Sequence, residues 1–164
     1  MRVAKGSRGT FGLLDVVAGW LVTTLHGYMY AVFISQLSTH LTPDWFTDPR
    51  FILGMALYAF GFTMNVHSDR IVRNLRSKEE VAKGERIYRI PTGGLFRYVT
   101  NPSYFTELVS FLGFAIATWS PGALFVLVVS AANLVPRAFQ VQKWYEAKFP
   151  DYPKDRKVLI PFLL

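Results

Sequence analysis

The sequence predicts an all-α integral membrane protein, a single domain of residues 1–164 built as a bundle of about four membrane-spanning helices. Of its 164 residues, 51% are hydrophobic and 16% aromatic, and its mean hydropathy is +0.24. This composition is too apolar for a soluble domain of that size. Three long stretches also contain no Asp, Glu, Lys or Arg, which is typical of segments that cross a bilayer.

The first uncharged stretch, residues 16–43, follows a basic segment at residues 1–10. A signal peptide also begins with basic residues and an apolar core, but this apolar stretch is too long and lacks a small-residue cleavage site. We therefore expect a retained helix at about residues 16–34. Two prolines and two aspartates then predict a short interfacial loop at residues 41–50.

The second and third uncharged stretches account for the remaining spans. Residues 51–68 are just long enough for one span. Residues 108–136 are interrupted by Ser120, Pro121 and Gly122, which favour a tight turn. We therefore expect two spans here, at residues 104–119 and 121–136, followed by a short amphipathic continuation and a basic tail.

The charges predict the topology. Four spans place the amino end, residues 69–103 and the tail on one side, which holds every lysine and arginine except Arg50. By the positive-inside rule, both termini face the cytosol. Topology thus explains the net charge of +7, and no nucleic-acid-binding pattern accompanies it, so we expect no nucleic-acid partner. With no cysteine and three histidines that lack ligand spacing, we expect no metal site.

Residues 65–107 form the only long polar segment between apolar runs. If residues 65–76 are helical, then Asn65, Asp69, Arg73 and Arg76 share one face. Such a stripe can bind a phosphorylated ligand through its guanidinium groups, or it can be the hydrated end of a membrane helix. Composition alone favours the second interpretation.

Three residues outside this stripe leave similar alternatives open. Glu107 either faces a polar cavity or lies in the first turn of a helix, where the helix dipole stabilises it. Arg137 either binds a phosphate or marks the membrane interface. Tyr145 either packs on a ring or belongs to an interfacial aromatic belt, and the belt is the more common arrangement.

Six segments of the sequence closely resemble the carboxyl-terminal part of the steroid 5-alpha-reductases, in the same order over about residues 25–164. They are WFTDPRF (45–51), NVHSDRIVRNLR (65–76), YRIPTGGLFRYVTNPSYFTELV (88–109), ATWS (117–120), PRAFQVQKWY (136–145) and FPDYPKDRKVLIPF (149–162).

The resemblance implies an all-helical reductase of the endoplasmic reticulum membrane that uses NADPH to reduce the 4,5 double bond of a 3-oxo-4-ene steroid. The lipid bilayer and a steroid or related lipid would then be its partners. Seven residues match the family's cofactor-lining positions: Asn65, Asp69, Arg76, Arg89, Glu107, Arg137 and Tyr145.

The chain also departs from the family pattern. Residues 77–86 form a longer connection than usual, and Ser103 replaces an Asn. We find no match to the Glu and Tyr pair that polarises the 3-oxo group in the family, so we expect a chain truncated relative to the full fold, with unassigned catalytic residues and little activity alone. Two alternatives remain: a non-catalytic membrane protein whose vestigial site binds anionic lipid or a partner, and a small transporter with Glu107 in its pathway.

Overall fold

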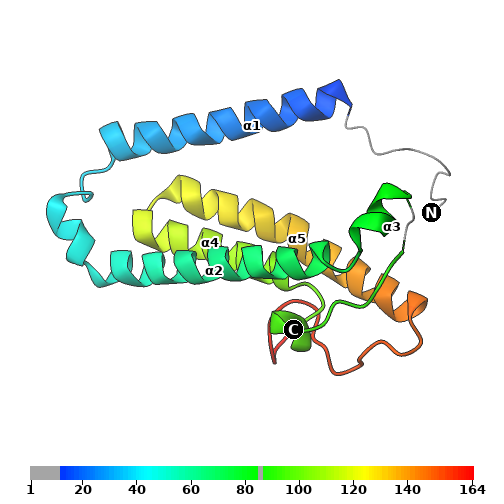
Figure 1. The fold of residues 1–164 in the computed structure, drawn as a ribbon. Coiled ribbons are helices and arrows are strands. Elements are labelled where there is room, and N and C mark those ends of the chain that lie inside the picture. Colours follow the sequence, from blue (N-terminus) through cyan, green and yellow to red (C-terminus); the bar gives the residue numbers. More distant parts are fainter. Residues whose placement is uncertain (1–11, 85–86) are drawn as a thin grey trace. The chain divides into compact units, whose positions relative to one another are not determined.

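The computed structural model describes residues 12–84 and 87–164 (Figure 1). Over these residues the chain forms helices, turns and loops, with one isolated bridge and no strand. The chain divides into two units, Met1–Leu41 and Thr42–Leu164, and each is described by itself. The predicted all-α class is confirmed.

The first unit contains one long helix. Helix α1 (Leu13–Val32) continues directly into a π-helical turn, η1 (Phe33–Leu37). Its hydroxyl groups are satisfied within the helix, since Thr23 and Ser35 each donate to the carbonyl four residues earlier, at 2.8 and 2.7 Å. This internal bonding allows polar side chains in a helix that has few polar neighbours. The basic segment at residues 1–10 lies outside the described residues.

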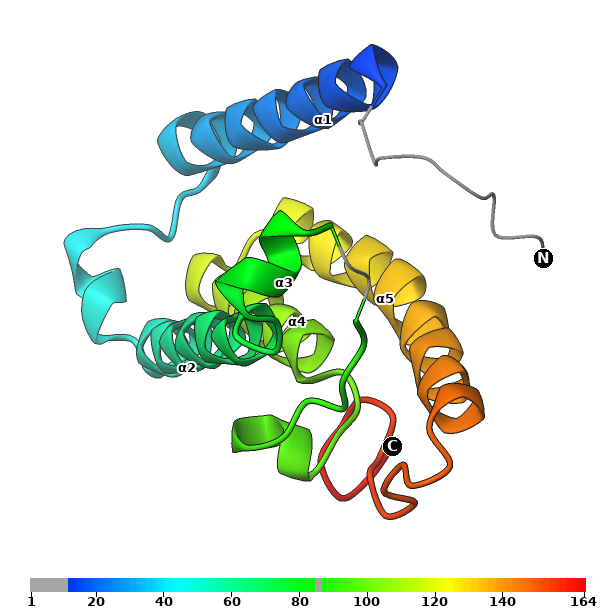
Figure 2. The ribbon, with the colours of Figure 1, turned by 45° about the vertical axis from the view of Figure 1, so that its right-hand side comes forward.

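The second unit contains the other helices. In chain order these are η2 (Pro43–Thr47), α2 (Pro49–Arg73), α3 (Lys78–Ala82), η3 (Gly94–Arg97), α4 (Pro102–Thr118) and α5 (Pro121–Lys148). Helices α2 and α4 run side by side in both ribbon views, and α5 follows α4 as the other arm of a helical hairpin (Figures 1 and 2).

Three of the helices have the length and composition to cross a membrane: Val16–Leu37, Pro49–Arg73 and Pro121–Lys148, among the described residues. They correspond to three of the expected spans, and a helical membrane bundle is confirmed. Helix α4, which matches the expected span at residues 104–119, has 17 residues. At 1.5 Å per residue it extends about 26 Å, slightly less than the roughly 30 Å of a bilayer core.

The turn between α4 and α5 lies where the sequence predicted it. Trp119 ends α4 in the left-handed conformation (φ 48°), and Ser120 caps α5 by accepting from the Ala123 N–H. Pro121 occupies the first turn of α5, where its missing N–H has no helical partner to lose. Helix α5 then runs through Pro136 without interruption to Lys148, so the expected amphipathic continuation belongs to the same helix.

Helices α2 and α4 approach so closely that their glycines have no room for a side chain. A Cβ atom at Gly61 would lie 2.6 Å from the Thr106 carbonyl oxygen, and one at Gly54 would lie 2.4 Å from the Ala117 nitrogen. At Gly113 of α4, the nearest atom would be the Tyr58 nitrogen, at 2.4 Å. Small residues of this kind permit close backbone packing between membrane helices. The contact fixes the end of α2 against the beginning of α4.

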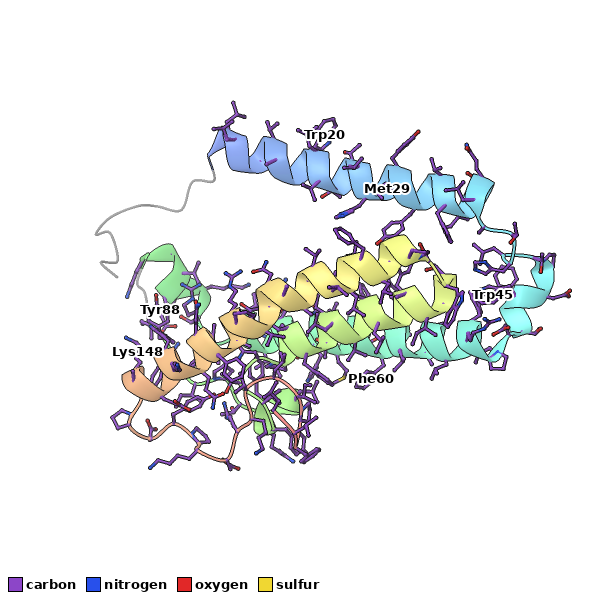
Figure 3. The ribbon with its side chains drawn as sticks, turned by 180° about the vertical axis from the view of Figure 1, so that it is seen from behind. Trp20, Met29, Trp45, Phe60, Tyr88 and Lys148 are labelled. Carbon is purple, nitrogen blue, oxygen red and sulfur yellow. The ribbon has the colours of Figure 1, made fainter. Side chains whose placement is uncertain are left out.

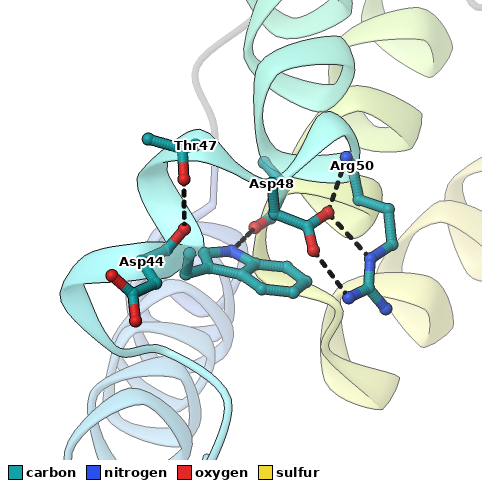
Figure 4. Close-up of polar contacts among 6 residues, drawn as sticks. Asp44, Thr47, Asp48 and Arg50 are labelled. Atoms are coloured by element: carbon teal, nitrogen blue, oxygen red, sulfur yellow. Dashed lines mark hydrogen bonds and ion pairs between the residues drawn. The ribbon is translucent and has the colours of Figure 1, made fainter.

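A tryptophan and an arginine join the other ends of these helices. The Trp45 indole N–H donates to the Ala117 carbonyl oxygen at 2.8 Å, and Trp45 is 6% exposed. The Arg50 guanidinium lies 4.5 Å from the Trp45 ring and 5.0 Å from the Trp119 ring. Asp48 accepts from Arg50 through both carboxylate oxygens, as Figure 4 shows. This cluster anchors the predicted interfacial loop, residues 41–50, to the turn between α4 and α5.

A buried asparagine joins three segments beside α4. The Asn101 side-chain amide donates to the carbonyl oxygens of Ala138 in α5 and Val158 in the tail, at 3.1 and 3.0 Å. A short parallel bridge between Val99 and Lys157 also holds the tail against this loop. The first turn of α4 therefore has a fixed position relative to α5 and the tail.

Candidate functional site

Polar side chains from α2 meet the first turn of α4 at Ser103. The Asn65 side-chain amide donates to the Ser103 carbonyl oxygen at 2.8 Å and contacts the Thr106 hydroxyl at 3.3 Å. The Ser103 hydroxyl donates to the Asp69 carboxylate at 2.9 Å. Asn65 and Asp69 are one helical turn apart on α2, so both reach the same neighbour. The structure thus brings two of the predicted site residues together through Ser103.

A cavity of about 580 Å³ lies next to this group, between the end of α2 and the later part of α5. We call it the arginine cavity, because two of the predicted arginines line it. Its lining residues are Val72, Leu75, Arg76, Ile87, Tyr88, Arg89, Val141, Trp144 and Tyr145.

A second cavity, of about 300 Å³, extends toward the beginning of α4. It shares Val72, Val141 and Tyr145 with the arginine cavity, so the two adjoin. Asp69 and Ser103 are part of its wall. We call these two adjoining cavities together the hollow: Arg76 and Arg89 line the first cavity, and Asp69 and Ser103 line the second.

Aromatic rings form one wall of the hollow. Tyr145 stacks on Tyr152 with ring centroids 5.4 Å apart, and Trp144 meets Tyr88 edge to face at 5.1 Å. The Lys148 ammonium lies 5.0 Å from the Tyr88 ring, and Figure 3 shows these two residues at the same end of α5. Tyr145 therefore packs against the ring of another residue of this chain.

The two cavity arginines differ in their partners. Arg89 makes a two-point ion pair with Glu80 of α3, at 2.9 and 2.6 Å, and also donates to the Leu75 carbonyl oxygen. The Arg89 guanidinium lowers the pKa of Glu80 from 4.5 to about 2, helped by the Ser77 N–H and by the nearby charge of Arg76. Arg76 itself is exposed, and its side chain makes no hydrogen bond or ion pair with any described residue.

Arg76 lies outside the helix in which the polar stripe was expected. Helix α2 ends at Arg73, and the N–H of Asn74 bonds to carbonyls of the last turn. Ser77 then starts α3, where its hydroxyl accepts from the Glu80 N–H and Glu80 accepts from the Ser77 N–H. The condition set for the stripe, a helix over residues 65–76, is therefore met only as far as Arg73, and a reciprocal cap at Ser77 starts the next helix.

Three of the predicted residues, Asn65, Glu107 and Arg137, line neither cavity. Glu107 is half-buried on α4, near enough to Asp69 for their charges to interact. Arg137 is exposed on α5, and its side chain bonds to no described residue. Sequence reasoning did not propose the apolar wall residues Val72, Leu75 and Ile87. Val141 and Trp144 also form the wall, and their spacing of three on α5 was a signal that they share a helical face.

Comparison with known proteins identifies the family. Residues 9–164 match the family model described as 3-oxo-5-alpha-steroid 4-dehydrogenase. The chain belongs to this family. It is 47% identical over 161 residues to mouse (Mus musculus) 3-oxo-5-alpha-steroid 4-dehydrogenase 1, covering 98% of this chain and 60% of the relative. It is 37% identical over 161 residues to the tomato (Solanum lycopersicum) steroid 5-alpha-reductase DET2, with the same coverage.

Similarity extends to the second type of the mammalian protein in this family. The pig (Sus scrofa) 3-oxo-5-alpha-steroid 4-dehydrogenase 2 is 43% identical over 139 residues, covering 85% of this chain and 51% of the relative. The chain thus spans about 60% of the length of its mouse and tomato relatives in the steroid dehydrogenase family.

Proposed function

We propose that this chain is the cofactor-binding part of an NADPH-dependent membrane reductase that acts on a carbon–carbon double bond conjugated to a ketone in a steroid or related lipid. The observation that carries the proposal is the hollow that joins Arg76 and Arg89 to Asp69 and Ser103 past an aromatic wall. The printed names of the relatives supply the class of substrate.

The residues present fit a phosphorylated dinucleotide. An arginine guanidinium group can donate two parallel hydrogen bonds to phosphate oxygens, and Arg76 and Arg89 supply two such groups in the arginine cavity. At the other end, the Asp69 carboxylate accepts hydrogen bonds, and the Asn65 oxygen is free to accept beside it. Aromatic rings such as Tyr145 offer flat apolar surface between these ends.

In this proposal the chain's residues bind and orient the cofactor, which supplies a hydride when bound. Arg76 and Arg89 hold phosphate groups, while Asp69, kept in place by Ser103, holds a hydroxyl or amide group. Glu107 and Arg137 are proposed to complete the set by their match to family positions, although neither lines the hollow. The predicted set is thus Asn65, Asp69, Arg76, Arg89, Glu107, Arg137 and Tyr145.

Binding of NADPH to the chain in lipid nanodiscs tests the cofactor part of the proposal. We expect Asp69→Ala, Arg76→Ala and Arg137→Ala each to weaken binding by about 10-fold or more, since hydrogen bonds to charged groups contribute about 1.5–3 kcal/mol. Lys143→Ala is the matched control: like Arg137, Lys143 is an exposed cation of α5 outside both cavities, but it matches no cofactor-lining position of the family. Equal losses in all four variants, or no binding by the wild type, would contradict the assignment.

Turnover of a 3-oxo-4-ene steroid tests the substrate part. The measurement compares membranes containing residues 1–164 alone with membranes containing a chimera that adds the amino-terminal part of the mouse relative. We expect NADPH-dependent reduction by the chimera and little by the shorter chain, since reduction of an enone needs a placed proton donor and a pocket. A chimera that binds NADPH but leaves the steroid unchanged would argue against this substrate class.

We also propose that the chain resides in the endoplasmic reticulum membrane with both termini in the cytosol, because this orientation places nearly all basic residues on one side. Protease-sensitive tags on Met1 and Leu164 test the orientation in sealed microsomes. Both tags should be cleaved without detergent, and protection of either one would exclude the proposed topology.

A further inference from the structure

The ion pair with Glu80 occupies part of the Arg89 guanidinium group. Both carboxylate oxygens of Glu80 accept from the terminal nitrogens of Arg89, at 2.9 Å for Nη1 and 2.6 Å for Nη2. Nη1 also donates to the Leu75 carbonyl oxygen. Three of the five N–H donors of Arg89 are therefore engaged. They include the terminal edge of the guanidinium, which is the pair of N–H groups, one on Nη1 and one on Nη2, that bind Glu80.

Glu80 is held in this place by the helix that carries it. Its carboxylate also accepts from the Ser77 N–H at 2.8 Å, while the Glu80 N–H bonds to the Ser77 hydroxyl at 3.1 Å. This reciprocal cap ties the side chain to the start of α3.

A carboxylate and a phosphate require the same terminal edge of an arginine, since both bind guanidinium with two parallel hydrogen bonds. The edge of Arg89 cannot serve both at once. Glu80 also lies near Arg76, the second cavity arginine, so its negative charge opposes an anion at either side chain. A ligand phosphate in the arginine cavity must therefore displace Glu80 from Arg89 or bind in spite of it.

We propose that Glu80 is an internal counter-ion that competes with ligand phosphates for Arg89 and so sets the affinity of the arginine cavity for anions. The inference rests on the proposed function, which makes this cavity the phosphate end of the NADPH site. It adds a determinant of affinity that lies on α3 and outside the cavity lining.

The variant Glu80→Gln removes the charge and keeps the cap, because glutamine is also accepted at the third position of a capping box. Glu79→Gln is the matched control: it removes one negative charge from the neighbouring position of α3, whose side chain makes no contact with Arg89. Each protein is titrated in nanodiscs with NADPH and, separately, with inorganic pyrophosphate. Arg89→Gln alone and in combination with Glu80→Gln shows whether any effect passes through Arg89.

We expect Glu80→Gln to lower the Kd for both probes about two- to fivefold, the range for release of a solvent-exposed ion pair. Glu79→Gln should leave both values unchanged, and the gain from Glu80→Gln should shrink in the Arg89→Gln background. Unchanged or weaker binding of pyrophosphate by Glu80→Gln would overturn the inference. So would an equal gain in Glu79→Gln, because the effect would then be one of overall charge.

The two probes separate failure of this inference from failure of the proposed function. Pyrophosphate binding that tightens in Glu80→Gln, with no NADPH binding by any variant, would support the counter-ion and reject the proposed cofactor. NADPH binding that is the same in the wild type and Glu80→Gln would support the cofactor and reject the counter-ion. If neither probe binds to any variant, both are rejected.

Discussion

The close contact between α2 and α4 predicts a specific effect of Gly61→Ala. The new Cβ atom would lie 2.5 Å from the Ser110 hydroxyl oxygen and 2.6 Å from the Thr106 carbonyl oxygen. The carbonyl cannot rotate away, because it belongs to the α4 backbone. Ordinary contacts of a Cβ atom are 3.4–4 Å. The two helices must therefore separate by roughly 1 Å at this level, which is an overpacking change of the kind that costs about 1–3 kcal/mol.

This separation would reach the candidate site, which lies one turn further along α2. The Asn65–Ser103 bond is now 2.8 Å long, so an opening of roughly 1 Å takes it beyond the 3.2 Å limit of a normal N–H···O bond. Alanine favours a helix over glycine by about 1 kcal/mol, which offsets part of the cost. We expect a net loss of up to about 2 kcal/mol, a drop in Tm of up to about 8 °C and weaker NADPH binding.

Thermal unfolding followed by tryptophan fluorescence in nanodiscs, together with an NADPH titration, measures both effects. Ala59→Ser is the control, because it adds one heavy atom at an exposed position of the same helix. A Gly61→Ala protein with unchanged Tm and unchanged affinity would refute the argument that the glycine contact positions the site.

Three further predictions concern single contacts. Trp45→Phe should lower stability by about 1–3 kcal/mol in thermal unfolding, because a buried carbonyl loses its donor; a smaller loss than in an exposed Trp20→Phe control would contradict this. Ser103→Ala should weaken NADPH binding with little change in Tm, because Asp69 loses its hydroxyl donor while the backbone contact of residue 103 remains; a Tm loss without an affinity loss would show a structural role only. The Arg50 guanidinium lowers the pKa of Asp48 from 3.8 to about 2, so the stabilisation is complete above pH 3.8 and is lost as the pH falls through 2. The difference in Tm between the wild type and Asp48→Asn should accordingly disappear toward pH 2, and a constant difference would count against the ion pair.

The sequence predicts the helices of this chain better than it predicts their contacts. The α4–α5 turn was predictable because Pro121 and Gly122 disfavour a continuous helix locally. Pro136 is also a helix-disfavouring residue, although no glycine follows it, and α5 continues through it. A proline near the middle of a membrane helix can be accommodated in this way.

In the candidate site, too, positions on one helix were predictable from the sequence and contacts between distant segments were not. Asn65 and Asp69 were expected on one face of a helix, and they do share a neighbour. That neighbour, Ser103, is 34 residues beyond Asp69, and no periodicity connects the two positions. The pairing of Arg89 with Glu80 was likewise not predicted, because it depends on where a short capped helix places its third residue.

The two hydrogen bonds of the Asn101 side-chain amide have a practical consequence for changes made at the carboxyl terminus of the chain. Val158, which accepts one of them, lies in the tail, while Asn101 itself comes immediately before the first turn of α4. A deletion that removed residues from 157 onward would take away both the Val158 acceptor and the bridge to Val99. Asn101 and Ser103 both line the second cavity, so the disturbance would reach the hollow from the far end of the chain. Labels, fusions and truncations within the last eight residues are therefore expected to disturb the beginning of α4.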